Sequence, residues 1–158
     1  MYCEASRGKK RQPRHEGSLS TAMEQVYLAR IIMSVADKFT LGSESFSMEG
    51  TITSITNTPN GVTANVTGKL GHYGKAYLTY NFLTNPKHET QGSVTGIGRA
   101  ITDSGEANEG IRNGVWTRDG HMLTIYSLDD VSDGVINFCI ETWDFRDDSV
   151  RFELSRVE

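Results

Sequence analysis

From about residue 46 to the C-terminus, apolar and polar residues alternate with a period of two. Phe46, Met48 and Ile52 alternate with polar neighbours, as expected for a strand with one buried face. Similar runs follow, separated by turn-forming segments such as Asn60-Gly61, whose sequence favours a hairpin. The pattern predicts eight strands, over residues 46–53, 62–70, 75–83, 93–101, 108–117, 121–128, 135–143 and 149–157.

Eight strands joined by short turns predict an all-β fold, an eight-stranded antiparallel up-and-down β-barrel over residues 45–158. Closing the sheet removes its aggregation-prone edges. A barrel of this size is just wide enough to be filled by side chains or to hold one small ligand. We expect the longest connection, residues 84–91, to form a loop at an open end of the barrel.

Glycine is abundant, with 16 residues against only 3 prolines, and its positions agree with a small barrel. One group falls at expected turns, where positive φ is often required: Gly61, Gly71, Gly74, Gly105, Gly120 and Gly134. A second group falls inside strands, where glycine permits sharp bends: Gly50, Gly68, Gly96, Gly98, Gly110 and Gly114.

The first 36 residues lack the two-residue period. Residues 1–18 include the basic run Arg7–Arg14, which we interpret as a disordered arm; a nucleic-acid or anionic-surface patch and a localisation signal are the alternatives. Residues 19–36 predict an amphipathic helix, because Thr21–Glu24 fits a capping box and apolar residues follow at helical spacing. This helix would cover the barrel or bind a partner, and Met33 leaves open a later translation start.

The formal net charge of -4 conceals two different parts. Residues 1–32 carry six basic and three acidic residues, and the remainder carries ten and seventeen, so the body is strongly acidic. Nucleic-acid binding is therefore not expected. The two cysteines, Cys3 and Cys139, form no disulfide framework, and Cys139 lies in an apolar run typical of a buried thiol. With no apolar stretch of membrane-spanning length, we expect a cytoplasmic protein that does not bind membranes.

No local motif indicates a metal or a cofactor. The four histidines, His15, His72, His88 and His121, show no metal-ligand spacing. The acidic segment from Asp129 to Asp133 lacks the length and final Glu of a calcium loop, and we interpret it as a solvated turn. We therefore expect neither a metal site nor a cofactor.

Polar residues on otherwise apolar strand faces are the best candidates for a site. Asn113 lies between Ile111 and Val115 at strand spacing, and Asn137 and Glu141 share one face of a later strand. If these faces line the barrel lumen, they give an apolar cavity a few polar groups, the usual makeup of a small-molecule site. A carboxyl at Glu141 would then have a raised pKa and could act as a general acid or base, which makes it the candidate catalytic residue.

The opposite assignment of faces is nearly as consistent with the pattern. Arg112 and Trp116 would then face inward with Tyr126, giving an aromatic-lined cavity with one cation. Tyr80, on the apolar face of the third strand, is a further candidate for ligand contact. Because both faces are substantially apolar, we expect one to line the lumen and the other to pack against the helix or another subunit.

The stretch from Gly92 to Glu106, GSVTGIGRAITDSGE, followed by Asn113-Gly114-Val115-Trp116, resembles small bacterial barrels of the allene-oxide-cyclase and dirigent type. In those proteins a glycine-rich GxGxA strand turns at a DGE-like corner into the next strand. The similarity runs loosely from Phe46 to Val157 and includes no catalytic motif, so no catalytic residue is carried over. It implies a barrel with a hydrophobic cavity, frequent homo-oligomerisation, and a family divided between cyclase-like enzymes and barrels of unknown function.

Three functions are compatible with the sequence. The leading hypothesis is a barrel that binds a small apolar ligand in its lumen, as a carrier would. The second is a cyclase or isomerase that holds an apolar substrate in the same cavity, with Glu141 or a Tyr moving a proton. The third is a structural or oligomerisation protein with a filled barrel.

Overall fold

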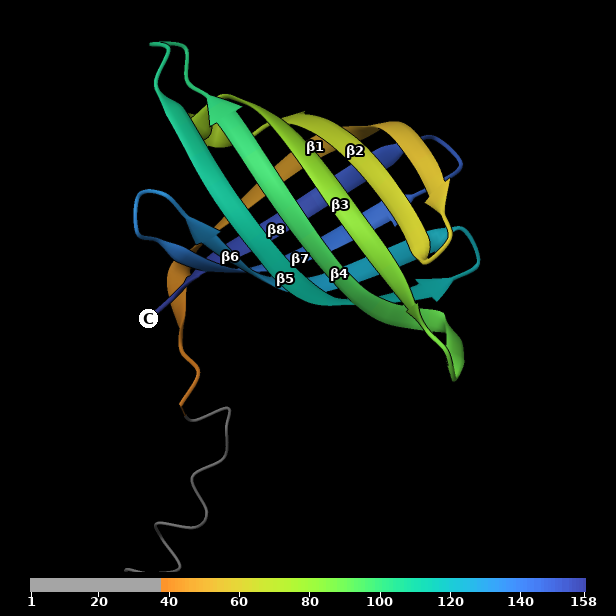
Figure 1. Cartoon of the computed structure of the whole chain (residues 1–158). Helices are drawn as coiled ribbons and strands as arrows, with labels where there is room; N and C mark the ends of the chain where they lie inside the picture. Colours follow the sequence, from red (N-terminus) through yellow and green to blue (C-terminus); the bar gives the residue numbers. More distant parts are fainter. Residues whose placement is uncertain (1–37) are drawn as a thin grey trace, which may run out of the picture. The chain divides into compact units, whose positions relative to one another are not determined.

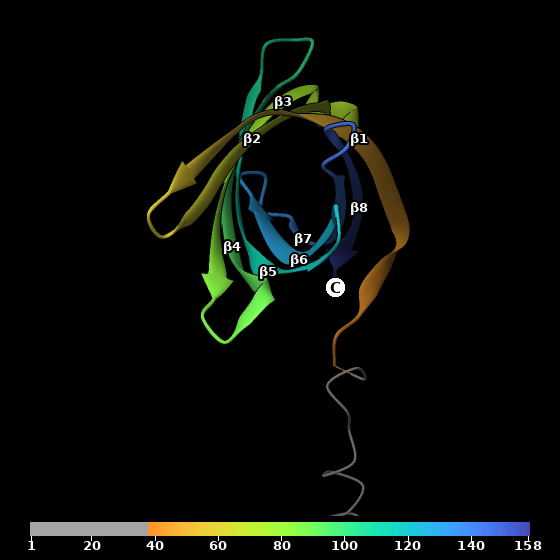
Figure 2. The same ribbon diagram turned by 90° about the vertical axis from the view of Figure 1, so that its right-hand side faces the viewer.

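The computed structural model describes residues 38–158, which form a closed barrel of eight antiparallel strands (Figure 1; Figure 2). Each strand pairs with its neighbours in sequence and the first pairs with the last, which confirms the up-and-down topology expected from the sequence. The expected arm and helix, residues 1–36, lie outside the described residues. The strands are β1 (Leu41–Thr58), β2 (Gly61–Lys69), β3 (Lys75–Asn85), β4 (His88–Ile101), β5 (Ala107–Asp119), β6 (Met122–Val131), β7 (Ile136–Asp144) and β8 (Ser149–Val157), with a 3-10 turn η2 (Gly71–Tyr73) between β2 and β3.

Strand β1 closes the barrel. Its first part pairs with β8, from Leu41 opposite Val157 onward, and its second part pairs with β2. The strand begins before residue 46, where the alternating pattern starts, because residues 42–45 are small or polar and carry no apolar face. Backbone pairing rather than hydrophobic burial therefore defines this end of the strand.

The β3–β4 connection is shorter than the sequence pattern indicates. The expected loop over residues 84–91 is wrong: the two strands continue until Asn85 pairs with His88, leaving a tight turn. The Lys87 backbone N–H donates to Asn85 Oδ1 at 3.0 Å and stabilises this turn. Residues 88–91 are exposed on both faces, so no apolar alternation marks them as strand.

The half of the lumen next to the β1–β2, β3–β4, β5–β6 and β7–β8 turns is packed with aromatic side chains. Phe82 makes edge-to-face contacts with Trp143, at 5.4 Å between ring centroids, and with Trp116, at 6.4 Å. The Trp116 Nε1–H donates to the backbone oxygen of Ser93 at 3.1 Å, which satisfies its polar group. Aliphatic residues complete this packing: Ile52, Val94, Leu123, Ile125 and Val150.

All six glycines expected at turns have positive φ. At Gly74, with φ 79°, a Cβ atom would lie 2.2 Å from the carbonyl oxygen of Ile101, so no other residue fits without moving the backbone. Two pairs of strand glycines face each other across the sheet, Gly50 with Gly68 and Gly98 with Gly110. At these paired positions neither strand of the barrel wall carries a side chain, which permits the sheet to bend.

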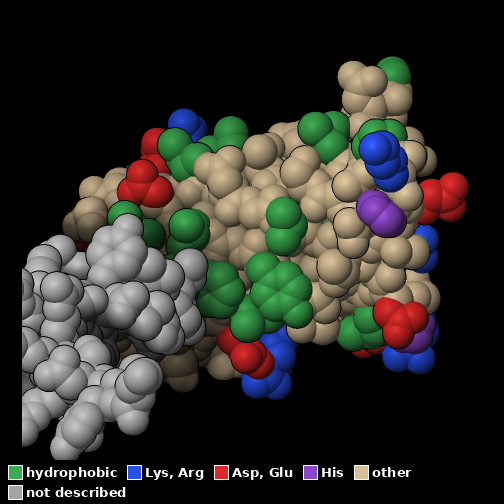
Figure 3. Space-filling view, turned by 90° about the horizontal axis from the view of Figure 1, so that it is seen from below, with side chains coloured by type: hydrophobic (Ala, Val, Ile, Leu, Met, Phe, Trp, Pro, Cys, Tyr) green, Lys and Arg blue, Asp and Glu red, His purple; other side chains and the backbone are tan. Residues whose placement is uncertain are grey.

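The outer wall of the barrel carries many exposed apolar residues. On one face of the molecule they lie in small separate groups among polar side chains (Figure 3). Strands β4, β5 and β6 contribute several of them: Ile97, Ile111, Val115, Tyr126 and Leu128. Within residues 38–158, no helix is both long enough and apolar enough to cross a membrane.

Candidate functional site

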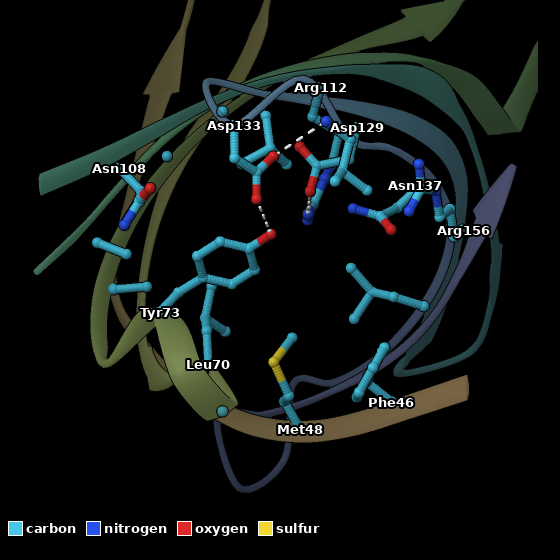
Figure 4. A pocket seen from close by; sticks show the side chains of 18 of the residues that line it. Phe46, Met48, Leu70, Tyr73, Asn108, Arg112, Asp129, Asp133, Asn137 and Arg156 are labelled. Carbon is cyan, nitrogen blue, oxygen red and sulfur yellow. Dashed lines mark hydrogen bonds and ion pairs between the residues drawn. The ribbon is translucent and has the colours of Figure 1, made fainter. Parts of the chain in front are cut away.

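The other half of the lumen is a cavity of about 710 Å³ (Figure 4). It opens at the end of the barrel formed by the β2–β3, β4–β5 and β6–β7 connections, the start of β1 and the end of β8. Its walls are largely apolar, and Phe46 and Met48 project from β1 beside Leu70 from the β2–β3 connection. Further apolar lining comes from Ala76, Leu78, Ala100, Val131 and Leu154.

Glycines on β4 and β5 create much of this space. Gly96, Gly98 and Gly110 all line the cavity. A Cβ atom at Gly96 would lie 3.3 Å from the Tyr80 ring and 3.4 Å from the Arg112 Cβ, tighter than ordinary packing. The glycine at position 96 therefore makes room for the two large polar side chains on the cavity floor.

The floor is a buried charge cluster centred on Arg112, whose side chain is 7% exposed. Its Nη1 donates to Tyr80 Oη at 2.7 Å and to Glu141 Oε1, and its Nη2 donates to Asp129 Oδ2 at 2.9 Å. The other oxygen of Glu141 accepts from Trp143 Nε1 at 3.0 Å. The cluster thus joins β3, β5, β6 and β7 across the lumen and separates the cavity from the aromatic half.

Burial and neighbouring charges shift the pKa values of Tyr80 and Arg112 in this cluster. Burial raises the pKa of the Tyr80 hydroxyl well above its usual range, so Tyr80 stays neutral. Burial by itself lowers the pKa of the Arg112 guanidinium, but the neighbouring carboxylates of Glu141 and Asp129 oppose this, and that pKa lies above its usual range. Arg112 therefore keeps its positive charge inside the barrel.

A hydrogen bond spans the cavity mouth. Tyr73 Oη, from the η2 turn, donates to Asp133 Oδ2 in the β6–β7 loop at 2.6 Å (Figure 4). Partial burial and this hydrogen bond raise the pKa of the Tyr73 hydroxyl, and the same bond lowers the pKa of the Asp133 carboxyl. Because the two connections lie between strand pairs on opposite sides of the ring, the contact crosses the opening.

The structure combines the two alternative face assignments. Arg112 and Trp116 face inward from β5, and Asn137 and Glu141 face inward from β7, with Tyr80 on β3. In the alternative predicted from the sequence, the Arg112 face of β5 lines the lumen together with the face of β7 opposite to Asn137 and Glu141. The register explains the difference: residue 112 pairs with residue 129, which pairs in turn with residue 137, so these three share one face.

The remaining sequence candidates lie outside the lumen. Asn113 is exposed on the outer face of β5, and Tyr126 is exposed on the outer face of β6. Glu141, the candidate catalytic residue, is fully buried behind Arg112, with both carboxylate oxygens bonded. Arg112, Tyr80 and Asn137 line the cavity, whereas Trp116 belongs to the aromatic half.

Two residues of the site were not recognised from the sequence. Asp129 was interpreted as part of a solvated turn, but it is the last-but-two residue of β6, is 9% exposed and binds Arg112. The alternation of Leu123, Ile125 and Ser127 continues inward to Asp129 and was the signal available. Tyr73 gave no such signal, because its contact with Asp133 joins positions 60 residues apart.

A reactive thiol or a metal site would give the described residues further chemistry. Cys139 is buried, as expected, and burial raises the pKa of its thiol to about 12. Within the part of the chain that the structure describes, no group of three His, Cys, Asp or Glu side chains is placed to hold a metal ion.

Comparison with known proteins adds no assignment. No protein-family model, curated protein sequence or solved structure matches this chain.

Proposed function

We propose that this barrel binds one small, largely apolar molecule in its lumen. The cavity is the observation that carries the proposal: about 710 Å³, open at one end of the barrel, with largely apolar walls over a polar floor. Small-molecule sites are concave, mostly apolar and between roughly 300 and 1,000 Å³, with a few polar groups that fix orientation. Arg112, Asp129 and Asn137 would supply those polar groups.

Among the described residues, the cavity opens at the end of the barrel next to Tyr73 and Asp133. The aromatic packing of Phe82, Trp116 and Trp143 fills the lumen at the opposite end. A ligand would enter past Tyr73 and Asp133 and place its inner end against the charge cluster.

Two observations favour binding over the alternatives. A proton-transfer enzyme needs its acid or base in reach of the substrate, whereas Glu141 is wholly buried and engaged by Arg112 and Trp143. A purely structural barrel needs no space inside it, whereas three glycines keep this half of the lumen open.

The proposal is tested with N-phenyl-1-naphthylamine, a largely apolar dye whose fluorescence rises in apolar surroundings. We expect saturable binding with one dye per chain. Ala100→Phe should abolish it, because Ala100 faces the cavity from β4 and a phenyl ring there would occupy the lumen. Ile101→Phe is the matched control, since Ile101 is the next residue on the same strand and its side chain is exposed.

Equal binding by the two variants, or no saturable binding by the unmodified protein, would contradict the proposal. Urea unfolding of both variants establishes that Ala100→Phe remains folded. We expect a cost of about 1–3 kcal/mol at most from the added ring.

A further inference from the structure

Two polar side chains on the cavity wall have acceptors free for a ligand. Asp129 uses Oδ2 to bind Arg112, and its Oδ1 has no hydrogen-bond partner among the described residues. Asn137 is 8% exposed, lines the cavity, and its side-chain amide likewise has no partner in residues 38–158 (Figure 4). The two residues are directly opposite each other in the β6–β7 register, so their inward side chains form one polar spot.

Gly110 keeps that spot open. A Cβ atom at position 110 would lie 3.1 Å from Asp129 Oδ1, so any larger residue would crowd this oxygen. The Asp129 side chain is 12% exposed, so its second carboxylate oxygen, which faces a largely apolar cavity, would be stabilised by a hydrogen-bond donor on a ligand.

The charge of the cluster selects the kind of partner. Arg112 is its one cation and Asp129 and Glu141 are its two carboxylates, so the buried cluster has an excess negative charge. Arg112 uses both N–H donors of Nη1 on Tyr80 and Glu141 and one of the two on Nη2 for Asp129. Its Nε has no partner but is enclosed by the protein, out of reach of a molecule in the cavity.

We propose that the ligand is an apolar amine, whose ammonium group binds Asp129 Oδ1 and the Asn137 amide oxygen while its hydrocarbon part fills the cavity. This inference rests on the proposed binding function and specifies its ligand class. The excess negative charge attracts a cation, and the free oxygens need a donor. A carboxylate ligand would face the Asp129 carboxylate, while the single charge of Arg112 already pairs with two carboxylates.

The charged side chains at the mouth of the cavity do not reverse the preference for a cationic ligand. Arg156 lies there, exposed, with the carboxylates of Asp133 and Glu158 also on the lining. Arg99 points to solvent and is paired with Glu109 at 3.0 Å. Exposed charges at the rim are screened by water and salt far more than the buried cluster.

The test displaces N-phenyl-1-naphthylamine with decylamine, decanol and decanoate, three probes with one chain length and different head groups. We expect decylamine to displace the dye at a concentration about tenfold or more below that of decanol, and decanoate to be the weakest, because like charges oppose each other in a desolvated site. Decanol or decanoate as the strongest competitor would overturn the amine inference and leave lumen binding intact. Absence of dye binding would instead remove the proposed function itself.

Two variants test whether Asp129 and Asn137 cause the preference for decylamine over decanoate. Asp129→Asn should reduce the ratio of decylamine to decanoate affinity about tenfold or more, since it removes the charge on the cavity wall. Asp130→Asn is its control, because Asp130 is the adjacent residue, exposed on the outer face of β6. Asn137→Asp should raise the same ratio, and it keeps the test decisive if Asp129→Asn fails to fold. An unchanged ratio in the folded variants would overturn the assignment.

Discussion

Arg112 is the residue on which the centre of the barrel depends. Its guanidinium is held by Tyr80, Glu141 and Asp129, each from a different strand. Removing one member of a buried ion pair is costly, because the remaining charge stays out of water without compensation. The guanidinium therefore allows two carboxylates to lie inside a largely apolar lumen.

Arg112→Met tests this dependence. It keeps much of the side-chain volume but leaves Glu141 and Asp129 without their cation, so we expect the free energy of unfolding in urea at pH 7 to fall by about 3–5 kcal/mol. Arg151→Met is the control, since Arg151 is largely exposed and pairs with the equally exposed Glu153. That change should cost no more than about 1 kcal/mol. Equal losses in the two variants would show that the buried cluster contributes no special stability.

The sequence predicts only some of the residues that form the site. Hydrophobic alternation does not distinguish the inward face of β5 from the outward face. The outward residues Ile111 and Val115 are as apolar as core residues, yet both are largely exposed. Asn113 was a candidate for this reason, whereas Tyr126 was grouped with Arg112 and Trp116 but pairs with the outward Val115. Register alone places Arg112 beside Asp129, and register is a property of pairing between strands rather than of one strand.

Two of the connections at the cavity mouth, the η2 turn and the β6–β7 loop, differ in how they are held. The β6–β7 loop is tied to β5, because the Ser132 N–H donates to the Glu109 carbonyl at 2.8 Å and Ser132 Oγ accepts from the Glu109 N–H at 3.1 Å. The η2 turn reaches this loop through the Tyr73 hydroxyl. The Tyr73–Asp133 bond therefore links the turn to a loop anchored on the barrel wall.

Tyr73→Phe removes this bond and keeps the ring. We expect the association and dissociation rates of N-phenyl-1-naphthylamine to rise severalfold with little change in affinity, because the hydroxyl closes the mouth without belonging to the floor of the site. Stability should change by no more than about 1.5 kcal/mol, as for one hydrogen bond. Stopped-flow fluorescence measures the rates, and Tyr77→Phe, on an exposed position of β3, is the control. Unchanged rates would show that the bond does not restrict entry.

The eight strands themselves could be predicted, and the errors fall at their ends. Alternation and turn glycines mark every strand, since inward and outward residues differ along most of each one. The start of β1 and residues 88–91 of β4 lack that contrast, because neither face is buried there. Backbone hydrogen bonding therefore extends these strands beyond the residues whose apolar and polar alternation reveals a buried face.

The folded barrel contains several neutral acids whose pKa values are raised. Cys139 is fully buried, and burial raises the pKa of its thiol to about 12. Burial also raises the pKa of Tyr80, and burial with the Asp133 hydrogen bond raises that of Tyr73. In an unfolded chain these groups titrate near about 8.5 for Cys and about 10 for Tyr. Folding thus retains protons that the unfolded chain releases in alkali.

Stability should therefore fall as the pH rises above about 9. The contribution of a raised pKa is fully present below the unfolded value, and it is lost progressively until the pH reaches the folded value, about 12 for Cys139. Each such group contributes a slope of up to about 1.4 kcal/mol per pH unit within its window. Urea unfolding at pH 8, 9, 10 and 11 measures the decline.

The variant Cys139→Ala removes one of these groups. Between about pH 9 and pH 10, before tyrosines titrate in the unfolded chain, the stability of this variant should therefore decline less steeply than that of the unmodified protein. Identical slopes would show that the Cys139 thiol ionises as readily inside the barrel as in the unfolded chain.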